Sequence, residues 1–190
     1  LLDKHIYKDF DNKNYKINSI LASELISFNR IDLGFKILYL ELRNKNKNLD
    51  DKIYFNHIKA LTFSTFTEKG NINKNSPNKF IKSFESLYKS LQKNGFKENI
   101  SLIPIEKSDS ILNGSHRLAI AIFLGMYVST IFINKKKFLY DYKFFYKRNI
   151  NTENIEDAID CISKYNKKLR IAILWPTSYD FHNQITNEIK

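Results

Sequence analysis

The chain has 190 residues, of which 43% are hydrophobic and 14% aromatic, so it can build the core of one domain and is not intrinsically disordered. Lys and Arg outnumber Asp and Glu by 31 to 20, which gives a net charge of +11 and suits an anionic partner. The surplus also has a plainer explanation. Lys, Asn and Ile are common here and have AT-rich codons, so an AT-rich genome would give the same balance with no nucleic-acid partner.

The cysteine and histidine content argues against an oxidising compartment and against a zinc site. Cys161 is the only cysteine, which excludes an intrachain disulfide, and we expect it to be a small buried or half-buried apolar residue. The four histidines are scattered without metal-ligand spacing. The longest nearly uncharged run, 118–133, is shorter than the roughly 20 residues of a membrane span. We therefore expect a cytoplasmic protein. Because the chain begins with Leu1 rather than Met, we expect it to be trimmed or part of a longer protein.

Apolar residues at helical spacing predict three helices before residue 63. Asn29 separates the first helix from the second, and the polar stretch 44–51 separates the second from the third. The apolar positions with this spacing are Leu21, Leu25, Ile31, Phe35, Leu38, Ile53, Ile58 and Leu61.

A fourth helix follows the polar loop 70–78 and is the clearest in the chain. Pro77 suits the first turn of this helix, and Gly95 suits its end. Its apolar stripe consists of Ile81, Phe84, Leu87, Tyr88 and Leu91.

After Gly95 the pattern changes to short strands alternating with helices. Pro104 interrupts the first apolar run, which predicts an edge strand or the end of a strand. The basic, aromatic segment 135–148 favours a half-buried strand with inward rings over a site for single-stranded nucleic acid. Strands are predicted at 101–105, 110–112, 127–133 and 169–175, and helices at 115–124, at 151–165 with Thr152 as N-cap, and from about 179.

These elements predict an α+β fold, in which N-terminal helices pack on a small mixed sheet built from the second half of the chain. We divide it into a helical N-terminal region (1–78), a core (79–150) and a C-terminal helix-strand-helix extension (151–190). We expect the three regions to form one unit.

One run of polar residues carries a chemical signal: Asn113, Gly114, Ser115, His116 and Arg117, hereafter the box. It lies where a strand ends and a helix begins, and free backbone N–H groups at a helix start favour an anion. Gly114 lets the backbone approach a ligand, Ser115 can cap the helix or donate its hydroxyl, and His116 and Arg117 add donors and charge. The box therefore predicts a phosphate site, although the same residues also fit an ordinary turn and cap.

The run from Asn113 to Ala119, before an apolar helix ending at Gly125, resembles the D-G-x-H-R-x-x-A box of the ParB/sulfiredoxin-like superfamily. The preceding helix, Gly95 and the strand Ile103-Pro104-Ile105 resemble the layout of these domains, so the likeness covers about 79–134. Members of the superfamily bind nucleotides, and the box contacts their phosphates. The resemblance implies a nucleoside triphosphate, ATP or CTP, as the cofactor, with or without Mg²⁺.

The box departs from several relatives. Ser115 stands where sulfiredoxins carry a reactive Cys, which argues against thiol repair. Partition proteins have a Glu and a second Arg that this box lacks, and no helix-turn-helix is evident after it. Asn113 stands where the free-amino-acid kinases have an acidic residue, which puts a metal or base role at this position in doubt.

Phosphoryl transfer would then need a carboxylate from elsewhere in the chain. Glu68, beside the polar loop, is the first candidate, and Glu106 and Asp109 come next, although each also fits a solvated surface carboxylate. We expect His57 to be a core or interface histidine rather than a catalytic one. Catalytic roles are thus predicted for Glu68, His116 and Arg117, and nucleotide binding for the whole box.

A second likeness concerns the acceptor. Arg30-Ile31-Asp32-Leu33 with Lys36 and Tyr39, together with Ile173-Leu174-Trp175-Pro176, resembles ParB-like domains of bacterial surface-polysaccharide loci. This likeness implies that the chain is the front part of a longer enzyme. Together with the box, it leads us to expect a phosphotransferase that acts on a small hydroxylated molecule or glycan precursor. The alternatives are a ParB-type nucleic-acid-binding module and a catalytically silent structural domain. The sequence does not indicate an oligomeric state.

Overall fold

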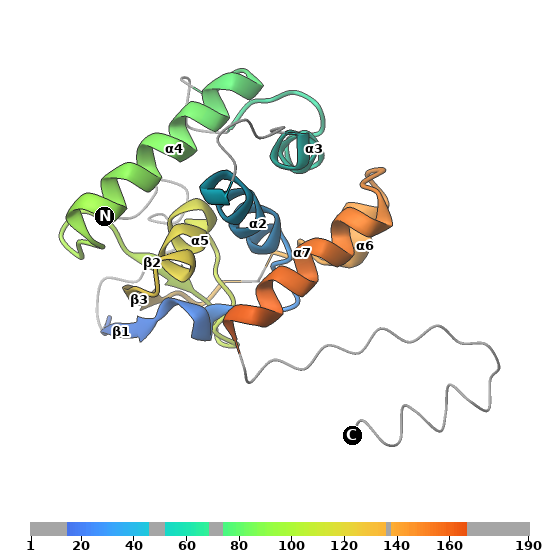
Figure 1. Ribbon diagram of the computed structural model, residues 1–190. Helices are drawn as coiled ribbons and strands as arrows, with labels where there is room; N and C mark the ends of the chain where they lie inside the picture. Colours follow the sequence, from blue (N-terminus) through green and yellow to red (C-terminus); the bar gives the residue numbers. More distant parts are fainter. Residues whose placement is uncertain (1–14, 46–51, 69–73, 136–137, 167–190) are drawn as a thin grey trace, which may run out of the picture.

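The structure, a computed structural model, describes residues 15–45, 52–68, 74–135 and 138–166 (Figure 1). Within these ranges the chain forms six α-helices, one 3-10 turn and a sheet of three strands, which is an α+β fold as predicted. The predicted strand at 169–175, with Trp175, and the predicted helix from about 179 lie outside the described residues.

The sheet is small and mixed. Its central strand is β3 (Tyr127–Phe132), with β1 (Ile17–Leu21) antiparallel on one side and β2 (Ile103–Ile105) parallel on the other. Because β2 is an edge strand, Pro104, which has no N–H to donate, is tolerated there as predicted.

The sequence predictions for residues 21–25 and 110–112 are wrong. Residues 21–25 form the end of β1 and a 3-10 turn, Ala22–Leu25, instead of a helix, so the sheet takes one strand from the first half of the chain. The pairing of β1 with β3 outweighs the local helical spacing. The segment 110–112 forms only a single bridge, between Ile111 and Ile105, and no strand.

The long helices of the first half lie where they were predicted. They are α2 (Asp32–Lys45), α3 (Lys52–Leu61) and α4 (Pro77–Asn94). Pro77 begins α4, and Gly95, with a φ of 71°, follows its last residue. The local start and stop signals of α4 therefore act as the sequence indicates.

The helices of the second half are α5 (Ser115–Phe123), α6 (Tyr142–Tyr146) and α7 (Thr152–Tyr165). The prediction of a half-buried strand at 135–148 is wrong, because Asp141 accepts a hydrogen bond from the Phe144 N–H and caps α6. At the start of α7 the capping side chain is Asn151, whose Oδ1 accepts from the Glu153 N–H at 3.0 Å, and not Thr152.

Helix α2 is central: it packs against α5 on one side and α7 on the other (Figure 1). Gly34 makes the approach to α7 possible, because a Cβ there would lie 2.1 Å from the Ala158 carbonyl oxygen. One apolar cluster runs from Ala22 to Ile162 and includes Cys161, which is buried as predicted. None of the described helices is both long enough and apolar enough to cross a membrane.

Candidate functional site

A cavity of about 590 Å³ lies at the start of α5 and is lined by all five residues of the box. Four other segments of the described chain contribute to its wall. Their polar side chains are Arg30, Asp32, Thr62, Thr67, Glu68, Lys74 and Tyr140, and the apolar ones from α3 and α4 are Ile58, Leu61, Phe80 and Leu87. The fold thus brings the box together with Glu68, the first candidate carboxylate.

The turn before α5 leaves the helix start without a side-chain cap. Gly114 is the N-cap residue, in the left-handed region with φ 83° and ψ 23°, and the predicted capping by Ser115 is absent. Asn113 Oδ1 accepts a hydrogen bond from the Gly114 N–H at 2.6 Å, so this amide is already bonded within the turn. The amides of Ser115 and His116 follow it in the first helical turn, where N–H groups have no partner within the helix.

Arg117 folds back over this turn. A Cβ on Gly114 would lie 2.9 Å from Arg117 Nη2 and 2.9 Å from Ile103 Cδ1. Gly114 is therefore required both for its positive φ and for the close approach of the guanidinium group. As a result, a positive side chain lies beside the positive end of the helix dipole, and both favour an anion in the cavity.

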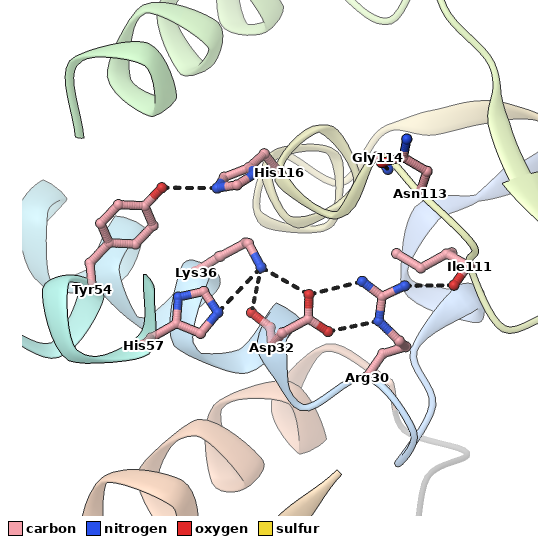
Figure 2. Close-up of polar contacts among 9 residues, drawn as sticks. All are labelled: Arg30, Asp32, Lys36, Tyr54, His57, Ile111, Asn113, Gly114 and His116. Atoms are coloured by element: carbon pink, nitrogen blue, oxygen red, sulfur yellow. Dashed lines mark hydrogen bonds and ion pairs between the residues drawn. The ribbon is translucent and has the colours of Figure 1, made fainter. Parts of the chain in front are cut away.

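His116 faces the core side of the cavity and carries no charge near neutral pH. Its Nε2 lies 2.9 Å from the Tyr54 hydroxyl oxygen (Figure 2). Its ring also meets the Phe84 ring edge-on. Burial, followed by the charges of Lys36 and Lys74, lowers the pKa of His116 well below its usual value. In this neutral form the ring can offer a hydrogen bond, and the neutralisation of phosphate charge by His116 stays a prediction.

Of the three carboxylates predicted as candidates, one lies on the cavity wall and two lie elsewhere. Glu68 lines the cavity, and its Oε2 lies 2.7 Å from Lys74 Nζ. Glu106 is buried and accepts a hydrogen bond from Ser108, and Asp109 is exposed on a turn. Of these three described residues, only Glu68 is placed to act in the cavity.

Beneath the box lies a buried charged network that the sequence did not predict (Figure 2). Arg30 donates from Nε and Nη2 to the two oxygens of Asp32, at 2.8 and 2.9 Å, and from Nη1 to the Ile111 carbonyl at 2.5 Å. Lys36 donates to Asp32 Oδ2 at 2.9 Å and to the Asp32 carbonyl at 3.1 Å. Arg30 thereby links the start of α2 to the segment that leads into the box.

The balance of charge in this network favours an ionised Asp32. Burial alone would raise the pKa of Asp32, but the charges and hydrogen bonds of Arg30 and Lys36 outweigh it and hold the pKa well below its usual range. Burial lowers the pKa of Lys36, and the Asp32 carboxylate opposes this shift. In the sequence, these three residues are marked only by the likeness of Arg30-Ile31-Asp32-Leu33 and Lys36 to ParB-like domains of polysaccharide loci.

His57 completes the network from α3. Its Nε2 lies 3.4 Å from Lys36 Nζ, and because an ammonium group only donates, Nε2 accepts and Nδ1 carries the proton. Nδ1 is buried without a hydrogen-bond partner among the described residues, and the ring stacks on Phe35 at 5.2 Å. Burial lowers the pKa of His57 well below its usual value. It is a neutral core histidine, as predicted, and supports the site from below.

The residues of the cavity do not fit a metal ion held by the protein alone. Among the described residues, no group of three or more His, Cys, Asp or Glu side chains could hold one. Both Asp32 oxygens are bonded to cations, which leaves Glu68 as the other carboxylate of the wall. No step of the proposed reaction is therefore assigned to a metal.

Comparisons of the chain with models of known protein families, with curated proteins and with solved structures gave no match. The ParB/sulfiredoxin-like resemblance of the box stays a prediction. The geometry of the cavity is therefore the basis for assigning a function.

Proposed function

We propose that the cavity binds a nucleoside triphosphate, ATP or CTP, and that the protein transfers its terminal phosphoryl group to a small hydroxylated acceptor, such as a glycan precursor, in the cytoplasm. One observation carries the proposal: the uncapped start of α5, the Arg117 side chain and the Glu68 carboxylate all line one cavity. The first two suit phosphate groups, and the third can accept a proton.

The phosphates would lie at the start of α5. The amides of Ser115 and His116 and the Ser115 hydroxyl can donate to phosphate oxygens, and the Arg117 guanidinium can bind two of them at once. Gly114 carries no side chain that would block this approach. His116 would add a neutral hydrogen bond at most.

The nucleoside would lie against the apolar part of the wall. Ile58 and Leu61 from α3 and Phe80 and Leu87 from α4 line the same cavity as the box. A volume of 590 Å³ lies within the range of about 300–1,000 Å³ that is typical of small-molecule sites. The cavity thus combines an apolar wall with a cationic end, as a nucleotide requires.

Glu68 would act as the general base. Its carboxylate accepts the proton of the acceptor hydroxyl, whose oxygen forms a bond to the terminal phosphorus. The bond from this phosphorus to the bridging oxygen breaks, and the nucleoside diphosphate leaves with the electron pair. Arg117 and the α5 amides stabilise the charge that develops on the phosphoryl oxygens.

Ligand binding is the first test. At 100 times its dissociation constant, a bound nucleotide stabilises the fold by about 2.7 kcal/mol, which raises the melting temperature by about 5–10 °C for a chain of this size. The chain is melted with ATP, CTP, GTP and the matching diphosphates. If no nucleotide raises the melting temperature, the proposal is wrong and a silent structural domain is the better description.

Arg117→Ala tests the assignment of the phosphate site. We expect turnover of the triphosphate with a hydroxylated acceptor to fall about 100-fold, which corresponds to about 2.7 kcal/mol of transition-state stabilisation. The matched control is Arg43→Ala, because Arg43 is 41% exposed and pairs with Glu85 away from the cavity. Equal activity in the two variants would contradict the assignment.

A specific observation favours one alternative function. On α6, Tyr142 and Tyr146 are exposed and stack on each other, and Lys143 and Lys147 are exposed beside them. Exposed rings with interleaved lysines suit single-stranded nucleic acid, whose binding weakens steeply with salt. If single-stranded DNA binds with such a salt dependence and Tyr146→Ala weakens it, while no nucleotide binds, the nucleic-acid-binding module replaces the phosphotransferase.

A further inference from the structure

Lys74 is a cation of the cavity wall to which neither the box nor the proposed reaction gives a role. Its side chain is 14% exposed, and its Nζ lies 2.7 Å from Glu68 Oε2 and 5.4 Å from the centre of the Phe80 ring. It lines the same cavity as Arg117 and Ser115. Lys74 therefore contacts Glu68, the proposed base, and lines the cavity in which the phosphates would lie.

The charge of Lys74 acts on His116, which lines the cavity, and on Lys36, which does not line it. It helps to lower the pKa of His116 on α5 and that of Lys36 on α2. The Lys74 ammonium group thus acts electrostatically on residues of both α5 and α2. Its position suits an anion held between Lys74 and the start of α5.

We infer that Lys74 binds the terminal phosphates of the nucleotide and releases Glu68 when it does so. This inference rests on the proposed function. The Lys74–Glu68 pair is partly exposed, with Glu68 41% exposed, so the pair itself stabilises the fold little. A lysine ammonium on its flexible stem can exchange one carboxylate for the larger negative charge of a triphosphate.

Because Lys74 leaves Glu68 only for the phosphates, Glu68 can act as the general base only when the nucleotide is bound. In the structure an ammonium N–H of Lys74 occupies Glu68 Oε2, which is an oxygen that would otherwise accept the acceptor proton. Once Lys74 moves to the phosphates, this oxygen becomes available to the acceptor hydroxyl. The Lys74–Glu68 pair thereby couples base activation to binding of the phosphoryl donor.

Two variants with opposite expected effects test the exchange. Dissociation constants for ATP and CTP, and for the corresponding mono- and diphosphates, are measured on the full 190-residue chain by calorimetry. For Lys74→Met we expect triphosphate affinity to fall about tenfold or more, because a charge-assisted contact is lost, and monophosphate affinity to change little. Lys74→Arg should keep part of the triphosphate affinity.

Glu68→Gln removes the partner that competes for Lys74. We expect its triphosphate affinity to equal or exceed that of the wild type, while its turnover is lost. The matched control is Lys89→Met, because Lys89 is exposed on α4 and does not line the cavity. Melting temperatures of all variants show whether each one is folded.

The outcomes separate this inference from the function on which it rests. If the wild type binds no nucleotide, the proposed function fails and the inference fails with it. If the wild type binds triphosphate and Lys74→Met binds it within twofold of the wild type, only the inference is wrong. If Lys74→Met and Glu68→Gln weaken triphosphate binding equally, Lys74 only holds Glu68 in place and the exchange does not occur.

Discussion

Two ion pairs of the molecule have the same spacing and nearly the same length but opposite surroundings. Asp32–Lys36 in α2 and Asp160–Lys164 in α7 are both i, i+4 pairs, with N–O distances of 2.9 and 2.8 Å. The side chains of the first are 1% and 0% exposed, and those of the second are 68% and 58% exposed. The first lies beneath the candidate site and the second lies in solvent.

The difference shows how burial changes the role of the same pattern. Asp32 also receives two hydrogen bonds from Arg30, and Lys36 also donates toward His57, so each buried charge has several partners. Asp160 and Lys164 form a partly screened surface pair. A buried pair that loses one partner leaves an uncompensated charge, whereas a surface charge is solvated by water. The buried network therefore fixes the floor of the cavity.

Asp32→Asn is expected to have the largest effect. It leaves Arg30 and Lys36 as buried cations without a carboxylate, and we expect the free energy of unfolding to fall by about 3–5 kcal/mol. Urea unfolding measures this loss.

Because the Asp32→Asn variant can fail to fold, the triple replacement Arg30→Met, Asp32→Leu and Lys36→Met is made as well. It is expected to cost less than Asp32→Asn, since no charge stays buried. A loss below about 1 kcal/mol for Asp32→Asn would contradict this view of the network.

Two histidines, the buried His57 and the half-buried His116, predict a dependence of stability on pH. His57 and His116 have lowered pKa values in the folded chain, whereas an unfolded histidine has a pKa of about 6.5. Below pH 6.5 the unfolded state binds more protons, so stability is complete above this pH and falls as the pH decreases. The expected slope is up to about 1.4 kcal/mol per pH unit for each histidine.

Urea unfolding between pH 6.5 and 5.5 checks this slope. His116→Gln should remove one of the two contributions and His57→Gln the other, so each variant should show about half of the wild-type slope. A wild-type slope equal to that of the double variant would show that these two rings do not titrate as their burial requires.

Gly114→Ala is expected to have an intermediate effect, and Gly125→Ala is its matched control. Both glycines have positive φ, 83° and 65°, so both substitutions carry a backbone cost of about 1–2 kcal/mol. Of the two, only Gly114 would place the new Cβ against other atoms, those of Arg117 and Ile103, while no atom of the described residues lies within 4 Å at Gly125. Gly114→Ala should therefore destabilise the fold more and, by displacing Arg117, weaken nucleotide binding, which Gly125→Ala should leave unchanged. Equal nucleotide affinities in the two variants would contradict this placement of Arg117.

Elements with local signals were predicted well from the sequence. Pro77, an apolar stripe and Gly95 together determine α4, and all of these signals lie within its own length. The box could be found for the same reason, because a turn glycine followed by His116 and Arg117 is a local pattern. The strand β1 could not be found in this way. Its pairing with β3 joins Ile17 to Ile131, and no local property of residues 17–21 shows that partner.

The floor and wall of the site were harder to predict, again for physical reasons. A charged residue is by default a surface residue, so nothing marks Asp32 as buried until the fold brings Arg30 to the Ile111 carbonyl, 81 residues away. Glu68 could be proposed because it stands beside a polar loop. Lys74 could not, because a lysine in an Asn- and Lys-rich segment is indistinguishable in sequence from its solvated neighbours.

Asp160→Asn is expected to have the smallest effect and completes the comparison of the two pairs. An exposed i, i+4 pair contributes about 0.3–0.5 kcal/mol, so its loss should barely change urea unfolding at low salt. In 1 M salt the screening length falls to about 3 Å, so even this difference should vanish, while the cost of Asp32→Asn should persist because water and ions do not reach it. Spacing and distance are shared by the two pairs, so any difference in salt response must come from burial. If the two substitutions cost the same amount and respond equally to salt, Asp32 is solvated in solution and the cavity has no fixed charged floor.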